Sequence, residues 1–223
     1  MPKQHSKFVA LNERLVDYLC ECRTGANDKT LAALREETAK LGEISIMQIG
    51  PEQGSFMTVL VAAIGARNAI EIGTFTGYSS ICIARGLPAN GRLLCLDESA
   101  EWIDIARGFW KRAGVDKKIT LILGNATENL KKLPRKRNFD FAFIDASKTE
   151  YDAYFELVLP RMRRNGVILF DNMLWRGRLG KKAPIRNPAG KAIDALNRKL
   201  SRDLRVESVL LSIGDGVLMC RVR

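Results

Sequence analysis

The sequence predicts an α/β fold in which a mostly parallel, seven-stranded sheet is covered by helices on both faces. From residue 69 onward, short apolar runs alternate with helical stretches, as is typical of parallel strands buried on both sides. The last two apolar runs are joined only by Gly214-Asp215-Gly216, and three residues are too few for a parallel crossover. We therefore expect five parallel strands and a C-terminal antiparallel hairpin within one sheet.

Helices are expected before the first strand. Apolar residues recur at helical spacing over 8–19 and 31–41, and Pro51 suits the first turn of a third helix. We expect residues 1–66 to pack as helices on a core of residues 67–223, within a single domain.

The expected strands are short, continuous apolar runs. In chain order they are Ala69–Ile72, Leu93–Leu96, Ile119–Leu123, Phe139–Ile144, Val167–Phe170, Val206–Ile213 and Val217–Val222. Helical patterns lie between the first five, near 78–86, 99–113, 126–133 and 150–159. Asn187-Pro188 then supplies an N-cap and a first helical residue for a helix to about Leu200.

The composition excludes several kinds of protein. With 223 residues, 46% of them hydrophobic, the chain can bury a core without disulfides or a structural metal. It has neither an apolar stretch that could span a bilayer nor a secretory leader, so we expect no membrane partner and a cytoplasmic location. The five cysteines are odd in number and lack metal-binding spacing, and the single histidine, His5, argues against Ser–His and Cys–His catalytic pairs.

A glycine-rich turn and an acid follow the first two expected strands. Gly73 and Gly77 permit a tight turn and close approach of a ligand, and Ser79 opens a helix whose free N–H groups favour an anion. Asp97 can accept hydrogen bonds from both hydroxyls of a ribose. Each feature also has an ordinary explanation: the glycines can serve any strand-to-helix turn, and Asp97 can be an acid at the N-terminus of the next helix. Together they favour a nucleoside ligand, and the G-x-x-x-G spacing disfavours a nicotinamide dinucleotide.

Polar residues also end the fourth and fifth expected strands. Asp145, Asp171 and Asn172 should meet at one sheet edge and form an all-oxygen, negatively charged cluster that suits Mg²⁺, Mn²⁺ or Ca²⁺. Lys148 lies three positions after Asp145 and could act as a general base. The alternative for Asp171-Asn172 is a turn or a cap without a metal. The alternative for Lys148 is an ordinary surface lysine paired with an acid.

Motifs spread over nearly the whole chain, in the expected order, resemble those of the cation-dependent O-methyltransferases, the caffeoyl-CoA and catechol O-methyltransferase group. This resemblance implies a Rossmann-like fold. The turn alone is typical of many methyltransferases, whereas its combination with Asp145, Lys148 and Asp171-Asn172 is more specific. The matching segments are Met47-Gln48-Ile49, Pro51-Glu52-Gln53-Gly54, Glu71–Ser80, Gly124-Asn125-Ala126, Phe139–Lys148, Asp171-Asn172, Leu174-Trp175 and Gly214-Asp215-Gly216.

The resemblance implies S-adenosylmethionine as methyl donor, a divalent cation, and a small acceptor with vicinal hydroxyls, free or linked to coenzyme A. It places Ile49, Glu71, Gly73, Thr74 and Ser79 at the methionine and sulfonium groups, Asp97 at the ribose and Ala126 at the adenine. Asp145, Asp171 and Asn172 would hold the cation, most simply Mg²⁺, with Asp145 also beside the donor. Lys148 would take the proton from the acceptor hydroxyl, and relatives of this kind are typically homodimers.

Two residues depart from the family pattern. The family pattern at positions 145–148 is commonly D-A-D-K, and Ser147 stands in place of its second acid. Arg176 follows the Trp, at a position where relatives often have Asn or Ser. Similar proteins that methylate a hydroxylated uridine in tRNA can carry a small residue at this position, so a tRNA methyltransferase is the second hypothesis. A non-catalytic nucleoside- or RNA-binding module is the third, and the intact Asp145, Lys148, Asp171 and Asn172 argue against it.

The net charge of +11 favours anionic partners only if the cations gather near the site. Two basic groups, 131–137 and 161–164, precede strands and should lie at the far edge of the sheet. A third should overhang the site and could guide a phosphate-bearing acceptor such as a coenzyme A thioester or RNA, or it could be a solvated loop. Its members are Arg176, Arg178, Lys181, Lys182 and Arg186.

Overall fold

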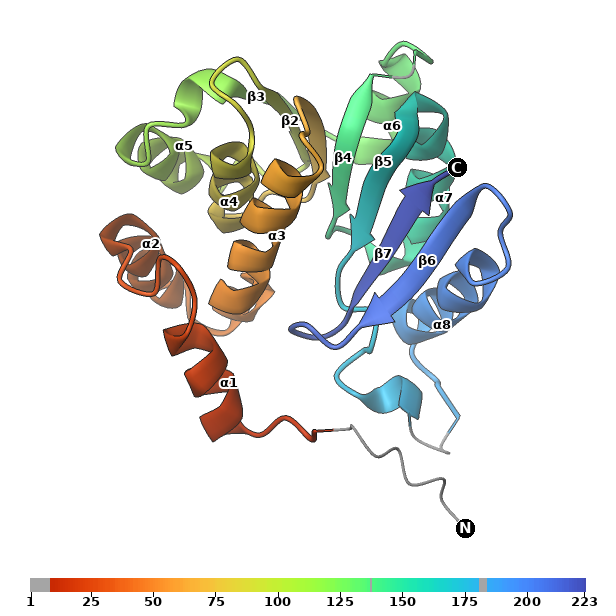
Figure 1. The fold of residues 1–223 in the computed structure, drawn as a ribbon, viewed down its shortest axis with the longest axis horizontal. Helices are drawn as coiled ribbons and strands as arrows, with labels where there is room; N and C mark the ends of the chain where they lie inside the picture. The colour runs from red at the N-terminus through yellow and green to blue at the C-terminus, as the bar shows by residue number, and fades with distance from the viewer. Residues whose placement is uncertain (1–8, 137, 181–183) are drawn as a thin grey trace.

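The computed structural model describes residues 9–136, 138–180 and 184–223, so His5, Arg137, Lys181 and Lys182 lie outside the described residues. A single twisted sheet runs through the molecule, with helices against both of its faces (Figure 1). No helix among the described segments is both long and apolar enough to cross a membrane.

The sheet has the seven strands that the sequence predicts, in the order β3-β2-β1-β4-β5-β7-β6. The first five are mutually parallel, and β7 runs antiparallel to both β5 and β6. The strands are β1 (Asn68–Ile72), β2 (Arg92–Asp97), β3 (Ile119–Leu123), β4 (Phe139–Ile144), β5 (Met162–Phe170), β6 (Val206–Leu211) and β7 (Val217–Val222). The predicted fold class is therefore confirmed.

Helices cover the two faces unequally, and each face has its own hydrophobic core. Helices α2 to α5 pack on one face, where Phe141 and Phe143 of β4 are fully buried. Helices α6 to α8 pack on the other, around Ala142 and Ile144 of the same strand. The helices are α1 (Glu13–Glu21), α2 (Lys29–Ala39), α3 (Pro51–Ala63), α4 (Tyr78–Gly86), α5 (Ile103–Arg112), α6 (Ala126–Lys132), α7 (Tyr151–Val158) and α8 (Pro188–Leu200).

Several element boundaries differ from the prediction. Helix α1 begins at Glu13, because the Asn12 side chain caps it by accepting a hydrogen bond from the Leu15 N–H. Strand β5 begins at Met162, five residues earlier than predicted, since the polar Asn165 at φ 63° interrupts the apolar pattern without ending the strand. Arg161 is buried rather than part of a surface basic group, and its guanidinium donates to the carbonyls of Leu157 and Leu133.

Strand register fixes the place of the candidate site. Ile72 pairs with both Leu96 and Ile144, and Ile144 pairs with Phe170, so four parallel strands end at one level. Residues just past these strand ends continue the ladder: Gly73 N–H donates to Leu96 at 2.9 Å and Asp145 N–H to Ile72 at 2.8 Å. The carboxyl edge of an open parallel sheet is where such folds bind ligands.

Candidate active site

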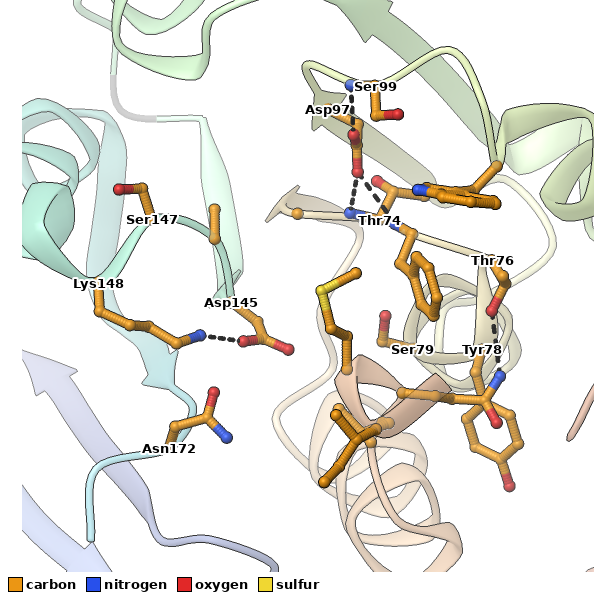
Figure 2. Close-up of a pocket in the computed structure, with 18 of the residues that line it drawn as sticks. Thr74, Thr76, Tyr78, Ser79, Asp97, Ser99, Asp145, Ser147, Lys148 and Asn172 are labelled. Atoms are coloured by element: carbon orange, nitrogen blue, oxygen red, sulfur yellow. Dashed lines mark hydrogen bonds and ion pairs between the residues drawn. The ribbon is translucent and has the colours of Figure 1, made fainter. Parts of the chain in front are cut away.

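A cavity of about 650 Å³ opens at this carboxyl edge. Figure 2 shows its two sides facing each other across the gap. One, the glycine-turn side, consists of Ile49, Gly73, Thr74, Phe75, Ser79, Asp97 and Ala126. The other, the charged side, consists of Asp145, Lys148, Asn172, Arg176, Arg178 and Asp215.

Glycine is required at the turn after β1. Gly73 has φ +91°, and a Cβ there would lie 2.1 Å from the backbone oxygen of Asp145. Gly77 has φ +86°, and a Cβ there would lie 2.7 Å from Trp110 Nε1. Both positions therefore need the left-handed conformation and the absence of a side chain. The turn brings the backbone of β1 against that of β4, at the junction of the two sides of the cavity.

Asp97 holds the same turn in place. Its Oδ2 accepts hydrogen bonds from the Thr74 N–H at 2.7 Å and the Phe75 N–H at 3.0 Å, and its Oδ1 accepts one from the Ser99 N–H at 2.9 Å (Figure 2). The carboxylate lines the cavity while three backbone donors fix its orientation. A carboxylate retains unused lone pairs after three such bonds, so it can still accept from a ligand hydroxyl.

Glu71 lies beneath the turn rather than in the cavity lining. It is completely buried, and its Oε2 accepts from Thr74 Oγ1 at 3.2 Å and Cys95 Sγ at 3.3 Å. Its Oε1 has no partner among the described residues. Burial raises the pKa of this carboxyl to about 8. Direct contact between Glu71 and a donor therefore remains a prediction.

The glycine-turn side is covered by residues that the sequence analysis did not assign to the site. The 3₁₀ segment η1 (Gly42–Met47) brings Ile46 and Met47 over the cavity. The Gln48 amide donates to Thr38 Oγ1 at 2.8 Å and Thr76 Oγ1 at 3.1 Å, which ties this segment to helix α2 and to the turn. Phe75, Trp102, Tyr154 and Trp175 add aromatic surface. Phe75, Trp102 and Trp175 lie outside regular helices and strands, so no periodic pattern singled them out.

On the charged side, Lys148 is held by two oxygens. Its Nζ lies 2.5 Å from Asp145 Oδ1 (Figure 2). The same Nζ lies 2.8 Å from the Tyr151 hydroxyl. Tyr151 is fully buried and donates to the backbone oxygen of Asp171 at 3.2 Å. Burial and the nearby acids raise the pKa of Tyr151 well above its ordinary value, so it serves here as a neutral hydrogen-bonding group. Tyr151 thus links the ends of β4 and β5.

The chemistry of the acids fits a divalent cation. Asp171 is only 4% exposed, and burial followed by repulsion from Asp145 raises the pKa of its carboxyl to about 7. A bound cation would offset the repulsion between these two carboxylates. Among the described residues, no group of three His, Cys, Asp or Glu could hold a metal. A site here therefore needs the Asn172 amide oxygen or water beside the two acids.

The segment after β5 has an unusual backbone. Asn172, Trp175 and Arg176 all have positive φ, at 59°, 50° and 53°. The turn between β6 and β7 supports them, because Asp215 Oδ1 accepts from the Arg176 N–H at 2.5 Å and the Asp215 carbonyl accepts from the Leu174 N–H at 2.8 Å. Non-glycine residues in this conformation are strained and gather at functional sites.

Arg176, Arg178 and Arg186 of the expected loop cations are all exposed. Arg176 and Arg178 line the cavity, whereas Arg186 does not. Ser147 also lines the cavity, where its hydroxyl lies 3.2 Å from that of Thr149. The second acid of the common family pattern is thus replaced by a small neutral group at the cavity wall.

Comparison with known proteins agrees with this geometry. Residues 22–223 match the family model described as O-methyltransferase. The chain is 38% identical to Tapetum-specific methyltransferase 1 of Arabidopsis thaliana (96% of each chain covered) and 34% identical to caffeoyl-CoA O-methyltransferase of Populus kitakamiensis (97% and 96%). The structure of the O-methyltransferase from Bacillus cereus in complex with SAH is similar, with TM-score 0.84, 31% identity and coverage of 94% and 97%. The chain therefore belongs to the O-methyltransferase family and is an S-adenosylmethionine-dependent O-methyltransferase.

Proposed function

We propose that the enzyme transfers a methyl group from S-adenosylmethionine to one hydroxyl of a small vicinal diol, such as a catechol, with the help of a divalent cation. The observation that carries the proposal is that the glycine-turn side and the residues Asp145, Lys148 and Asn172 line the same cavity. A donor and an acceptor bound on these opposite sides would meet at the junction between Gly73 and Asp145.

The glycine-turn side is the proposed donor site. Asp97 would accept the ribose hydroxyls, and Ala126 at the start of α6 would face the adenine. The methionine end would lie beside Ile49, Gly73, Thr74 and Ser79, with Glu71 beneath and Asp145 nearby. The SAH in the Bacillus cereus protein and the SAM in TomG of Streptomyces achromogenes support this class of donor.

The charged side is the proposed acceptor site. Asp145, Asp171 and Asn172 would hold the cation, with Mg²⁺ best suited to this oxygen set. When bound, the cation would bind the diol oxygens and lower the pKa of the hydroxyls.

The chain's own residues would handle the proton. Lys148 Nζ would hold the proton that leaves the acceptor hydroxyl, and Tyr151 and Asp145 fix where Nζ lies. The acceptor oxygen then forms a bond to the methyl carbon as the carbon–sulfur bond breaks, and S-adenosylhomocysteine leaves. Alignment of oxygen and methyl by the two walls would supply much of the rate.

Methyl transfer from labelled donor tests this proposal. We expect transfer to catechols but not to phenols that lack the second hydroxyl, loss of transfer in excess EDTA, and recovery with Mg²⁺. Bulk tRNA is assayed in parallel. Labelled tRNA with unlabelled catechols would make the tRNA enzyme the better hypothesis, and no transfer to either would favour a non-catalytic module.

We further propose a cytoplasmic homodimer. All five cysteines are free thiols, in agreement with a reducing compartment. Helix α1 has no buried residue, and Val16, Leu19 and Val59 leave apolar surface exposed on α1 and α3. Sedimentation equilibrium is expected to give twice the chain mass, and a monomer at all concentrations would contradict this.

A further inference from the structure

We propose that Arg176 determines acceptor specificity by binding a carboxylate carried on the diol, with Arg178 adding positive charge. This inference rests on the proposed function and names its substrate class more narrowly, as acidic catechols. Four features support it: the fixed backbone of Arg176, the position of its side chain at the cavity, its lack of an internal partner, and the charge of the surrounding wall.

Arg176 is held rigidly at the cavity wall. Its N–H bonds Asp215, and Arg178 N–H donates to the Trp175 carbonyl at 3.0 Å, which closes a turn around it. Trp175 is packed so tightly against α8 that a Cβ on Gly190 would lie 2.8 Å from its indole Nε1. A long, flexible side chain on such a fixed backbone loses less freedom when it binds a ligand than one on a loose loop.

The guanidinium of Arg176 forms no ion pair with any carboxylate of the described residues, and neither does that of Arg178. Arg205, by contrast, is paired with both Glu156 and Asp203. Asp215 on this wall accepts a hydrogen bond from the Arg176 backbone N–H, and the charge of Arg176 acts on this carboxylate without an ion pair. The planar donor set of Arg176 is thus available to a planar carboxylate, which it can bind with two parallel hydrogen bonds.

The charges of the acceptor site also favour an anion. Lys148 must be neutral to take the acceptor proton, so the ionised acids Asp145, Asp171 and Asp215 exceed the cations Arg176 and Arg178 by one negative charge. A divalent cation would then leave one positive charge in excess. Transfer of a proton from a neutral catechol to Lys148 leaves this excess unchanged, whereas a catechol with a carboxylate offsets it. Charge complementarity of this kind selects among ligands more than it raises affinity for all of them.

A carboxylate is favoured over a distant phosphate because Arg176 lines the same cavity as Lys148 and Asn172. An anion bound there must be carried on or next to the reacting ring. A phosphate at the end of a coenzyme A or RNA chain would instead meet cations outside the cavity, such as the exposed Arg186.

Matched acceptors test the inference. Wild type, Arg176→Asn, Arg176→Lys and the control Arg186→Gln are compared on 3,4-dihydroxybenzoate, on its uncharged methyl ester, and on 3,4-dihydroxybenzylphosphonate. Arg176→Asn is expected to lower kcat/KM for the benzoate by about 10- to 100-fold, the range for a hydrogen bond to a charged group, and for the ester by less than about 3-fold. Arg176→Lys should recover part of the loss, and Arg186→Gln should match wild type on all three acceptors.

Calorimetric binding of the benzoate and the ester to protein with S-adenosylhomocysteine and Mg²⁺ separates this inference from the proposed function. Benzoate binding that depends on Arg176 without turnover of any catechol would uphold the carboxylate site and overturn the proposed reaction. Turnover of ester and benzoate with equal losses in Arg176→Asn would overturn the role of Arg176 and leave the reaction intact. A larger loss on the phosphonate than on the benzoate would overturn the choice of a carboxylate.

Discussion

The glycine-turn side of the cavity is shaped by backbone, whereas the charged side is shaped by side chains from distant parts of the chain. On the first, Asp97 and two glycines fix the turn between β1 and α4 through N–H groups and close packing. On the second, Asp145 and Lys148 face a strained segment that is held by Asp215, 39 positions from Arg176. The glycine-turn side can therefore be rigid without a ligand, while the charged side concentrates charges that a ligand or cation must balance.

The largest effect is expected on the charged side. Asp171→Ala removes a buried carboxylate that we propose as a cation ligand, so turnover should fall at least about 1,000-fold, as when a charged group essential to transition-state stabilisation is lost. Donor affinity should stay within about 2-fold, because Asp171 is not part of the glycine-turn side. Steady-state kinetics and calorimetry with S-adenosylhomocysteine measure the two quantities. A variant that retains activity, or loses donor binding equally, would break the distinction between the two sides.

A backbone change should damage the glycine-turn side. Gly73→Ala would place a Cβ 2.1 Å from the Asp145 oxygen at a positive φ, and we expect destabilisation of about 3 kcal/mol or more. Gly108→Ala is the matched control: Gly108 lies in α5 with nothing within 4 Å of an added Cβ, so alanine should stabilise the helix by about 0.5–1 kcal/mol. Urea unfolding compares them, and equal stabilities would contradict the close contact at Gly73.

Asp97→Ala tests the side chain that fixes the turn. The variant loses the proposed ribose acceptor and three backbone hydrogen bonds, and we expect donor binding to weaken by about 1–3 kcal/mol. Asp97→Asn retains one acceptor oxygen and should lose less. Calorimetric titration with S-adenosylhomocysteine gives both values, and unchanged affinity in the alanine variant would exclude Asp97 from the donor site.

The smallest expected effect is a pH dependence of stability from Glu71. Its folded pKa of about 8 exceeds the ordinary 4.5, so the folded state binds more protons between these values, and this contribution to stability falls as pH rises. Glu71→Gln lacks that titration. The difference in unfolding free energy, wild type minus variant, should therefore decrease by about 1 kcal/mol from pH 7 to pH 8. A difference that stays flat over this range would show that Glu71 is ionised in the folded protein.

The strand ends could be predicted from the sequence because parallel strands bring residues far apart in the chain to one edge. The positions of Gly73, Asp97, Asp145 and Asp171 follow from this rule. The supports of the charged side could not be predicted. Tyr151 reads as an ordinary helix residue, and the bonds of Asp215 to the segment after β5 depend on how the hairpin lies across it. The positive φ of Trp175 and Arg176 has no signal in residue type, since neither residue favours that conformation.

We propose that the two sides of the cavity bind separate ligands and that only the charged side needs a cation. Calorimetry measures it directly, first with S-adenosylhomocysteine and then with 3,4-dihydroxybenzoate added to the loaded protein, each in Mg²⁺ and in EDTA. We predict that S-adenosylhomocysteine binds with the same affinity in both, within about 2-fold, and that the diol binds only with Mg²⁺. Diol binding that is equally strong in EDTA, or S-adenosylhomocysteine binding that disappears there, would show that the cation requirement is not confined to the charged side.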